Sequence, residues 1–234
     1  MKYSLFLFLT FISIASCKSS EAPLSLNYLV KEPNVKIAHP RTLILLHGVG
    51  SNAQDMFALA NQFPENYLVI SAQAPIELGH ESYAWYHLNI ENGKLIYSYE
   101  EAEKSRKILL QFIQEIKQKY QLNSEDIYLV GFSQGAIMSY NIGLTEPTSI
   151  KGIAVMSGRL MQELKEQITL KDKLKNLRIF VSHGTEDNTL AVLFAREAVA
   201  YLRALDLSPD YHEYPDGHTI DAAMMRDLLI WLAK

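Results

Sequence analysis

One serine stands in a sequence pattern that could perform nucleophilic chemistry. Ser133 is the centre of Gly131-Phe132-Ser133-Gln134-Gly135, which reads G-x-S-x-G. The β-prone run 127–130 precedes the pattern, and small and apolar residues suited to a helix follow it. The segment therefore predicts a strand, a sharp turn and a helix with the serine at the apex, the context of a nucleophile elbow. The alternative is a glycine-rich turn without chemistry, because glycine also permits close backbone packing.

A serine hydroxyl is a weak nucleophile, so it needs a base within hydrogen-bonding reach. That base is usually a histidine oriented by a carboxylate. Asp187 and His218 follow Ser133 in the chain, and each comes after an expected strand. The order serine, acid, histidine is one of the orders in which such triads occur. Glu186 is the competing acid, and the shorter Asp187 is preferred because the loop should turn after the strand.

The other histidines are interpreted as structural or surface residues. His212 lies within an expected strand and is interpreted as an exposed or edge residue, while His183 and His47 end buried strands and are interpreted as core histidines held by backbone groups. His39, His80 and His87 have no partner pattern, and no spacing of His, Asp and Glu predicts a metal site.

Acyl transfer also requires donors for a developing oxyanion. The backbone N–H of Gln134 is one candidate, because it would begin the helix after the serine, where the helix dipole favours negative charge. The loop His47-Gly48-Val49-Gly50 follows a predicted buried strand, and the N–H of Val49 is the second candidate. The alternative for this loop is a tight glycine turn with a purely structural purpose.

The elements that must position these residues alternate along the chain. Continuous or alternating apolar runs predict strands at 24–30, 42–46, 67–70, 127–130, 152–156, 178–182 and 210–214. Helices are expected after Asn52, over 100–120, from the serine to about 145, over 191–205 and at the end of the chain. This alternation predicts an α/β fold with a mostly parallel sheet and helices on both faces. Ligands of such sheets bind beyond the carboxyl ends of the strands, where the candidates lie.

Two of these segments carry more detailed expectations. Helix 100–120 should hold the ion pairs Glu100–Lys104 and Glu103–Lys107. Its buried side is expected to consist of Ile108, Phe112, Ile116 and Tyr120. The connection 71–99 is rich in aromatic residues. Its Tyr83, Trp85 and Tyr86 could line an acyl or aryl pocket, and ordinary packing is the alternative, favoured for Trp85.

The first residues predict export. Lys2 precedes an apolar stretch of about 13 residues, which is too short to span a bilayer. Ile14-Ala15-Ser16-Cys17 resembles the lipobox of bacterial lipoprotein precursors, in which the cysteine is lipidated after cleavage. We expect a signal peptide at 1–16, a lipidated Cys17 with a polar tether at 17–23, and one domain at 24–234. The protein would then be extracytoplasmic and bound to a bacterial membrane through its lipid only. A plain signal peptide is the alternative.

The composition gives no indication of nucleic-acid binding or of an internal disulfide. The 234 residues are 48% hydrophobic with a net charge of −4, and no lysine–arginine patch stands out, so nucleic-acid binding has no support. Cys17 is the only cysteine of the sequence, which excludes an internal disulfide.

The motifs taken together resemble the phospholipase/carboxylesterase family of α/β-hydrolases, which includes acyl-protein thioesterases. The matching segments cover about 41–234 and are Leu46-His47-Gly48-Val49-Gly50-Ser51-Asn52, Ala72-Gln73-Ala74-Pro75, Tyr83-Ala84-Trp85-Tyr86, Gly131-Phe132-Ser133-Gln134-Gly135, Met156-Ser157-Gly158, His183-Gly184-Thr185-Glu186-Asp187 and Gly217-His218. The resemblance implies a Ser/Asp/His triad that hydrolyses carboxylic or thio esters without a cofactor. Many relatives carry prolines after the acid, where this chain has Asn188 and Ala191, and most lack a leader.

The sequence thus predicts a serine carboxylesterase with a small-molecule ester substrate. A thioesterase or lysophospholipase would use the same triad. A catalytically silent binding lipoprotein is the alternative from another class.

Overall fold

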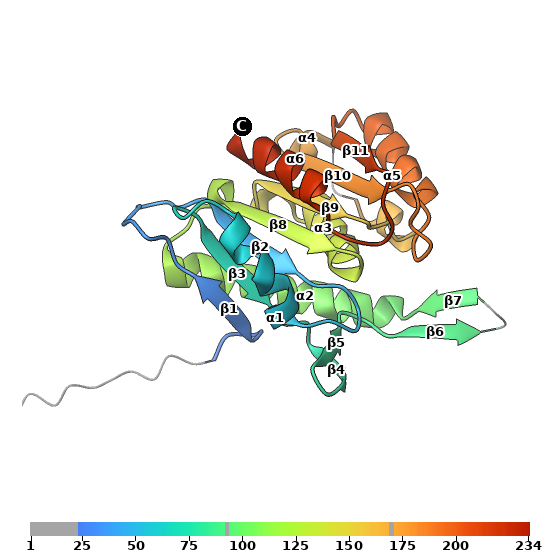
Figure 1. Cartoon of the computed structure of the whole chain (residues 1–234), viewed down its shortest axis with the longest axis horizontal. Helices are drawn as coiled ribbons and strands as arrows, with labels where there is room; N and C mark the ends of the chain where they lie inside the picture. The colour runs from blue at the N-terminus through green and yellow to red at the C-terminus, as the bar shows by residue number, and fades with distance from the viewer. Residues whose placement is uncertain (1–22, 92–93, 169–170) are drawn as a thin grey trace, which may run out of the picture.

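The computed structural model describes residues 23–91, 94–168 and 171–234 (Figure 1). The predicted signal peptide, Cys17 and all of the tether except Pro23 lie outside these ranges. The described chain forms a seven-stranded sheet in the order β1-β3-β2-β8-β9-β10-β11. These strands are β1 (Tyr28–Lys31), β2 (Thr42–Leu46), β3 (Leu68–Ala72), β8 (Ile127–Phe132), β9 (Gly152–Met156), β10 (Arg178–Gly184) and β11 (Asp210–Tyr214).

All neighbouring strands of this sheet are parallel except β1, which runs antiparallel to β3 with Tyr28 opposite Ala72. Every residue of β2, β3 and β9 is buried. Their continuous apolar runs fit strands that are covered on both faces. The predicted α/β fold with a mostly parallel sheet is therefore confirmed.

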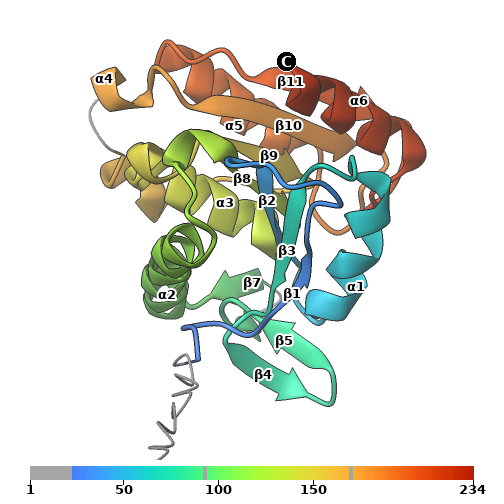
Figure 2. The same ribbon diagram turned by 90° about the vertical axis from the view of Figure 1, so that its left-hand side faces the viewer.

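Helices cover both faces of the sheet (Figure 2). The helices α2 (Tyr99–Tyr120), α3 (Gln134–Thr145) and α5 (Leu193–Ala204) share one hydrophobic cluster, and α1 (Ala53–Phe57) and α6 (Ala222–Ala233) pack into a second cluster on the other face. Shorter helical segments are α4 (Lys171–Leu174) and the 3₁₀ turns η1 (Ala58–Gln62), η2 (Ser124–Asp126), η3 (Pro147–Ser149) and η4 (Glu163–Glu166). Among the described residues, no helix has the length and apolar character needed to cross a membrane.

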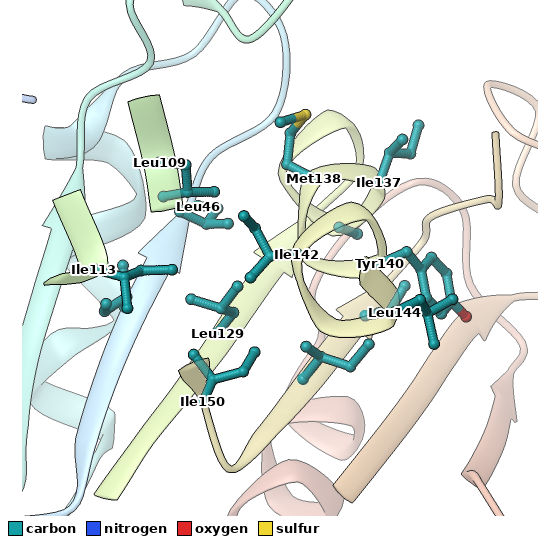
Figure 3. Packing of buried hydrophobic residues seen from close by; sticks show 14 of the residues in the cluster. Leu46, Leu109, Ile113, Leu129, Ile137, Met138, Tyr140, Ile142, Leu144 and Ile150 are labelled. Carbon is teal, nitrogen blue, oxygen red and sulfur yellow. The ribbon is translucent and has the colours of Figure 1, made fainter. Parts of the chain in front are cut away.

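The helix that follows Ser133 is the most deeply buried of these elements. Every residue of α3 from Gln134 to Leu144 is buried, as expected for a helix that is apolar on nearly all sides. Figure 3 shows Ile142 of α3 beside Leu129 of β8, with Leu109 of α2 nearby. Because α3 is packed between the sheet and α2, its first turn is held in a fixed position at the edge of the sheet.

The structure corrects several predicted boundaries. The first strand is Tyr28–Lys31 and not 24–30. The predicted pairs of α2 form, with Lys104 Nζ 2.8 Å from Glu100 and Lys107 Nζ 3.7 Å from Glu103. The buried side of α2 was partly wrong, because Ile108 and Tyr120 are only half-buried while Ala102, Ser105, Leu109 and Ile113 are buried with Phe112 and Ile116. The buried face is therefore turned slightly around the helix from the predicted one.

The connection 71–99 contains two hairpins that periodicity did not reveal. The strands β4 (Ile76–Gly79) and β5 (Ser82–Ala84) form the first, and β6 (Leu88–Glu91) and β7 (Lys94–Tyr97) form the second. Strands of three or four residues are too short for alternation to stand out from a loop.

Candidate active site

Ser133 lies at the apex of a strained turn between β8 and α3. Its backbone angles are φ 54° and ψ −116°, outside the regions that a residue with a Cβ ordinarily adopts. Glycine is required on both sides: a Cβ on Gly131 would lie 2.3 Å from the carbonyl oxygen of Gly135, and a Cβ on Gly135 would lie 2.1 Å from that of Leu46. The close passage of helix and strand thus fixes the turn and projects the serine from the sheet edge.

The structure brings the three predicted side chains together at that edge. Ser133 directly follows β8, while Asp187 and His218 lie in the loops after β10 and β11. Ser133 Oγ is 2.9 Å from His218 Nε2, and His218 Nδ1 is 2.6 Å from Asp187 Oδ2. With its proton on Nδ1, His218 donates to the carboxylate and can accept the serine proton on Nε2. This arrangement is able to activate the hydroxyl as a nucleophile.

Asp187 is held as a carboxylate by its surroundings. Its side chain is fully buried, and its Oδ1 accepts hydrogen bonds of 2.8 Å from the backbone N–H groups of Thr189 and Leu190. Burial by itself raises the pKa of the carboxyl group, but the hydrogen bonds from His218, Leu190 and Thr189 outweigh burial and lower the pKa below its usual value. The competing acid, Glu186, is exposed, and in the described part of the chain it forms no hydrogen bond or ion pair with His218 or Ser133.

The loops that carry the acid and the histidine pack directly against each other. A Cβ on Gly184 would lie 2.2 Å from the carbonyl oxygen of Asp216 and 2.3 Å from that of Gly217. The N–H of Glu186 also donates to Asp216 at 3.0 Å. Only a glycine at 184 lets the two loops approach closely enough for Asp187 to reach His218.

Two backbone N–H groups close to Ser133 are candidates for oxyanion donors. Gln134 is the first residue of α3, so its N–H is among those without an intrahelical acceptor. Val49 lies in the loop after β2, and within the described residues its N–H donates to no backbone carbonyl. Gly48 lies against the serine, since a Cβ there would be 3.2 Å from Ser133 Cβ. Both N–H groups are therefore available to an oxyanion.

The aromatic segment that was predicted to form a pocket has another place in the fold. Trp85 and Tyr86 are almost fully buried, at 0% and 1% exposure, and neither lines the cavity at Ser133. Tyr83 lines a neighbouring cavity of about 370 Å³. The pocket interpretation is therefore wrong for Trp85 and Tyr86, whose rings belong to the hydrophobic core, as the alternative for Trp85 anticipated.

The same segment forms hydrogen bonds to both parts of the chain that carry the candidate donors, the loop after β2 and the start of α3. Trp85 Nε1 donates to the carbonyl of His47 at 3.0 Å, and the side chain of Gln134 accepts from Trp85 N at 2.8 Å and donates to Tyr86 O at 2.7 Å. The backbone of Tyr83 pairs with the loop after β2, through hydrogen bonds of 2.9 Å to Gly50 and Ser51. These contacts join residues far apart in sequence, so no local pattern could have indicated them.

A cavity of about 450 Å³ opens beside Ser133 and His218. Its walls are mostly apolar, and the residues that line it are His47, Gly48, Val49, Ser51, Asp55, Met56, Leu59, Phe132, Ser133, Thr189, His218, Thr219 and Ile220. Met56 and Leu59 follow Asn52, where a helix was expected, but their place in the cavity wall was not predicted. The helical spacing of the two residues is the only signal in the sequence that could have indicated it.

Two other predicted histidines can be located. His47 is buried, accepts from Ala74 N at 3.1 Å through Nε2, and has Nδ1 2.7 Å from Gly48 O. Burial lowers its pKa, as suits a neutral ring held by backbone groups. His212 lies on the edge strand β11, where its Nε2 is 2.8 Å from Asp210. In the described part of the chain no group of three or more His, Cys, Asp or Glu side chains could hold a metal ion.

Comparison with known proteins identifies the family and the fold of this chain. The sequence model of the Phospholipase/Carboxylesterase family matches residues 29–234. Acyl-protein thioesterase 1 of Mycosarcoma maydis is 27% identical over 232 residues, covering 89% of this chain and 97% of that protein. The crystal structure of esterase PE8 superimposes with a TM-score of 0.75 at 27% identity, covering 91% and 99% of the two chains. The Bacillus cereus carboxylesterase, at 20% identity, has the same fold with a TM-score of 0.76 over 89% and 93%.

Proposed function

Because the chain belongs to the phospholipase/carboxylesterase family of hydrolases, we propose that residues 24–234 form one esterase domain with Ser133 as its nucleophile. His218 is the general base and Asp187 orients it. The observation that carries this proposal is the continuous hydrogen-bonded path from Ser133 Oγ through His218 to Asp187, with the serine on a strained turn.

The proposed reaction proceeds through an acyl-enzyme. Ser133 Oγ attacks the ester carbonyl while His218 Nε2 takes its proton, and the N–H groups of Val49 and Gln134 stabilise the oxyanion. His218 then protonates the departing alcohol oxygen. A water molecule attacks the acyl-enzyme with His218 again as the base, which releases the acid and restores Ser133.

The cavity supports an ester with an apolar part. Met56, Leu59 and Ile220 contribute apolar walls, and about 450 Å³ is in the range of small-molecule sites. Thioester hydrolysis, the activity in the name of the Mycosarcoma maydis relative, uses the same serine chemistry and is the second candidate. The joint presence of the nucleophile, its base, the orienting acid and two free backbone donors argues against a silent binding protein.

Turnover of matched substrates tests the proposed activity. The purified protein should hydrolyse p-nitrophenyl esters, and its kcat/KM should change with acyl length because the apolar walls contact the chain. Thioesters with the same acyl groups should be turned over with a lower kcat/KM. A higher kcat/KM for the thioester at every chain length would assign the protein to thioesterases, and failure to hydrolyse either class would contradict the proposal.

We further propose that the protein is a lipid-anchored, extracytoplasmic enzyme, on the basis of the lipobox-like Ile14-Ala15-Ser16-Cys17. In bacterial cells the wild-type protein should incorporate a palmitate analogue and sediment with membranes, because Cys17 is the cysteine that would be lipidated. The Cys17→Ser variant should do neither. Labelling of both proteins to the same extent would refute a lipid anchor at Cys17. Labelling of neither protein would favour a plain signal peptide.

A further inference from the structure

We propose that His183, a buried histidine outside the cavity, is a positioning residue that holds Asp187 in the orientation that His218 requires. This inference rests on the proposed function of Asp187 and His218. His183 is the second-last residue of β10 and is 0% exposed. It touches neither Ser133 nor the cavity, so it would act through Asp187 alone.

The contacts of His183 define where its proton lies. Its Nε2 is 2.7 Å from the carbonyl oxygen of Leu190 and 3.2 Å from Asp187 Oδ2. Both neighbours are acceptors, so Nε2 carries the hydrogen and donates it to Leu190 with a weaker share to Asp187. Nδ1 is buried and has no hydrogen-bond partner in the described part of the chain. A proton on Nδ1 would be an unsatisfied buried donor, which is costly, and this also favours the Nε2–H form.

Through Leu190, the ring of His183 also restrains the loop after β10 that carries Asp187. The N–H of Leu190 donates to Asp187 Oδ1 at 2.8 Å, and its carbonyl accepts from His183. The backbone of Leu190 is thus held on both sides, by Asp187 at its N–H and by His183 of β10 at its carbonyl. Residues 187–191 contain no proline that would fix a backbone angle, so these hydrogen bonds contribute to the order of the loop.

The carboxylate of Asp187 is consequently surrounded by donors on both oxygens. Oδ1 accepts from Thr189 and Leu190, and Oδ2 lies 2.6 Å from His218 and 3.2 Å from His183. A carboxylate with its acceptor positions filled cannot rotate without losing hydrogen bonds in a buried place. Without His183, the loop and Oδ2 lose one restraint, and the short bond to His218 is held only through the hydrogen bonds of Oδ1.

The test compares two substitutions of His183. His183→Leu removes the donor at similar volume, and we expect a fall of about 10²-fold in kcat per active site with little change in KM, the scale of a small misplacement of a catalytic group. His183→Gln keeps an N–H near the position of Nε2 and should recover most of that loss. Fluorophosphonate titration counts the intact sites, so that misfolded protein is not mistaken for slow protein. His212→Gln, a histidine of the neighbouring strand outside the site, is the matched control and should keep the wild-type kcat.

Two further measurements keep the inference testable. In an Asp187→Asn background, His183→Leu should have almost no additional effect on kcat, because both residues act through the same contact. Nitrogen-15 NMR of histidine-labelled wild-type protein should find His183 protonated on Nε2. An unchanged kcat per site in His183→Leu, a full additional loss in the Asp187→Asn background, or a proton on Nδ1 would each overturn the positioning role. The NMR result does not depend on turnover, so it still decides the state of His183 if the esterase proposal itself fails.

Discussion

The Ser133→Ala variant should hydrolyse esters with a kcat lower by about 10⁶-fold, because the alanine has no nucleophilic oxygen and only the oxyanion donors and substrate binding remain. The substitution should leave the fold intact. Among the described residues, Ser133 Oγ forms a hydrogen bond with His218 alone, and the turn is held by the backbone packing of Gly131 and Gly135. Steady-state kinetics together with a circular dichroism melt would measure both effects.

A covalent probe gives the same prediction a chemical readout. Mass spectrometry after fluorophosphonate treatment should find the adduct on Ser133 alone, because His218 is positioned to take the proton of this serine. Ser149→Ala is a suitable control, because Ser149 is about as buried as Ser133, at 7% against 8% exposure, and lies in η3 outside the cavity. An adduct on another serine, or activity surviving in Ser133→Ala, would refute the proposed mechanism.

The second large effect is expected at the acid. Asp187→Asn should reduce kcat by up to about 10⁴-fold, because an amide N–H turned toward His218 favours the tautomer with its proton on Nε2, which cannot accept from Ser133. Glu186→Gln should change kcat far less, since Glu186 is exposed and, among the described residues, the carboxylate that pairs with His218 is that of Asp187. Measurement of kcat for both variants decides between the two acids, and a larger loss in Glu186→Gln would transfer the orienting role to that residue.

The sign of the pKa shift adds a stability consequence for the same variant. The pKa of Asp187 is lower in the folded protein than its usual value, so its ionisation favours the folded state at neutral pH. That contribution is fully present above the pKa of the unfolded chain and is lost as the pH falls through the folded-state value. The stability difference between the wild type and Asp187→Asn should therefore shrink on acidification.

What the sequence could predict depends on how far apart the interacting residues lie along the chain. The elbow at Ser133 is encoded within five residues, and β2 and β9 were predicted with the bounds that the structure has, because buried strands are continuous local runs. Asp187 and His218 could be chosen because parallel strands bring their carboxyl ends to one edge. These features follow from periodicity and from fold rules that need no contact map.

Other features depend on contacts that no periodicity records. The burial of Trp85 and Tyr86, and their hydrogen bonds to the loops at 47 and 134, join segments separated by dozens of residues. Aromatic residues are common both in pockets and in cores, so composition could not separate the two outcomes. The positioning role that we propose for His183 could not be predicted either, because it depends on which atoms the buried ring contacts.

The antiparallel entry of β1 has a consequence for where the enzyme would work. Tyr28 lies opposite Ala72, at the carboxyl end of β3, so the N-terminal segment joins the sheet at the edge that carries Ser133. The seven residues of the expected tether, Cys17 to Pro23, reach at most about 25 Å even when fully extended. With the proposed lipid anchor, this tether confines the catalytic edge to a thin layer above the bilayer, so that esters gathered at the membrane surface meet it at a raised effective concentration.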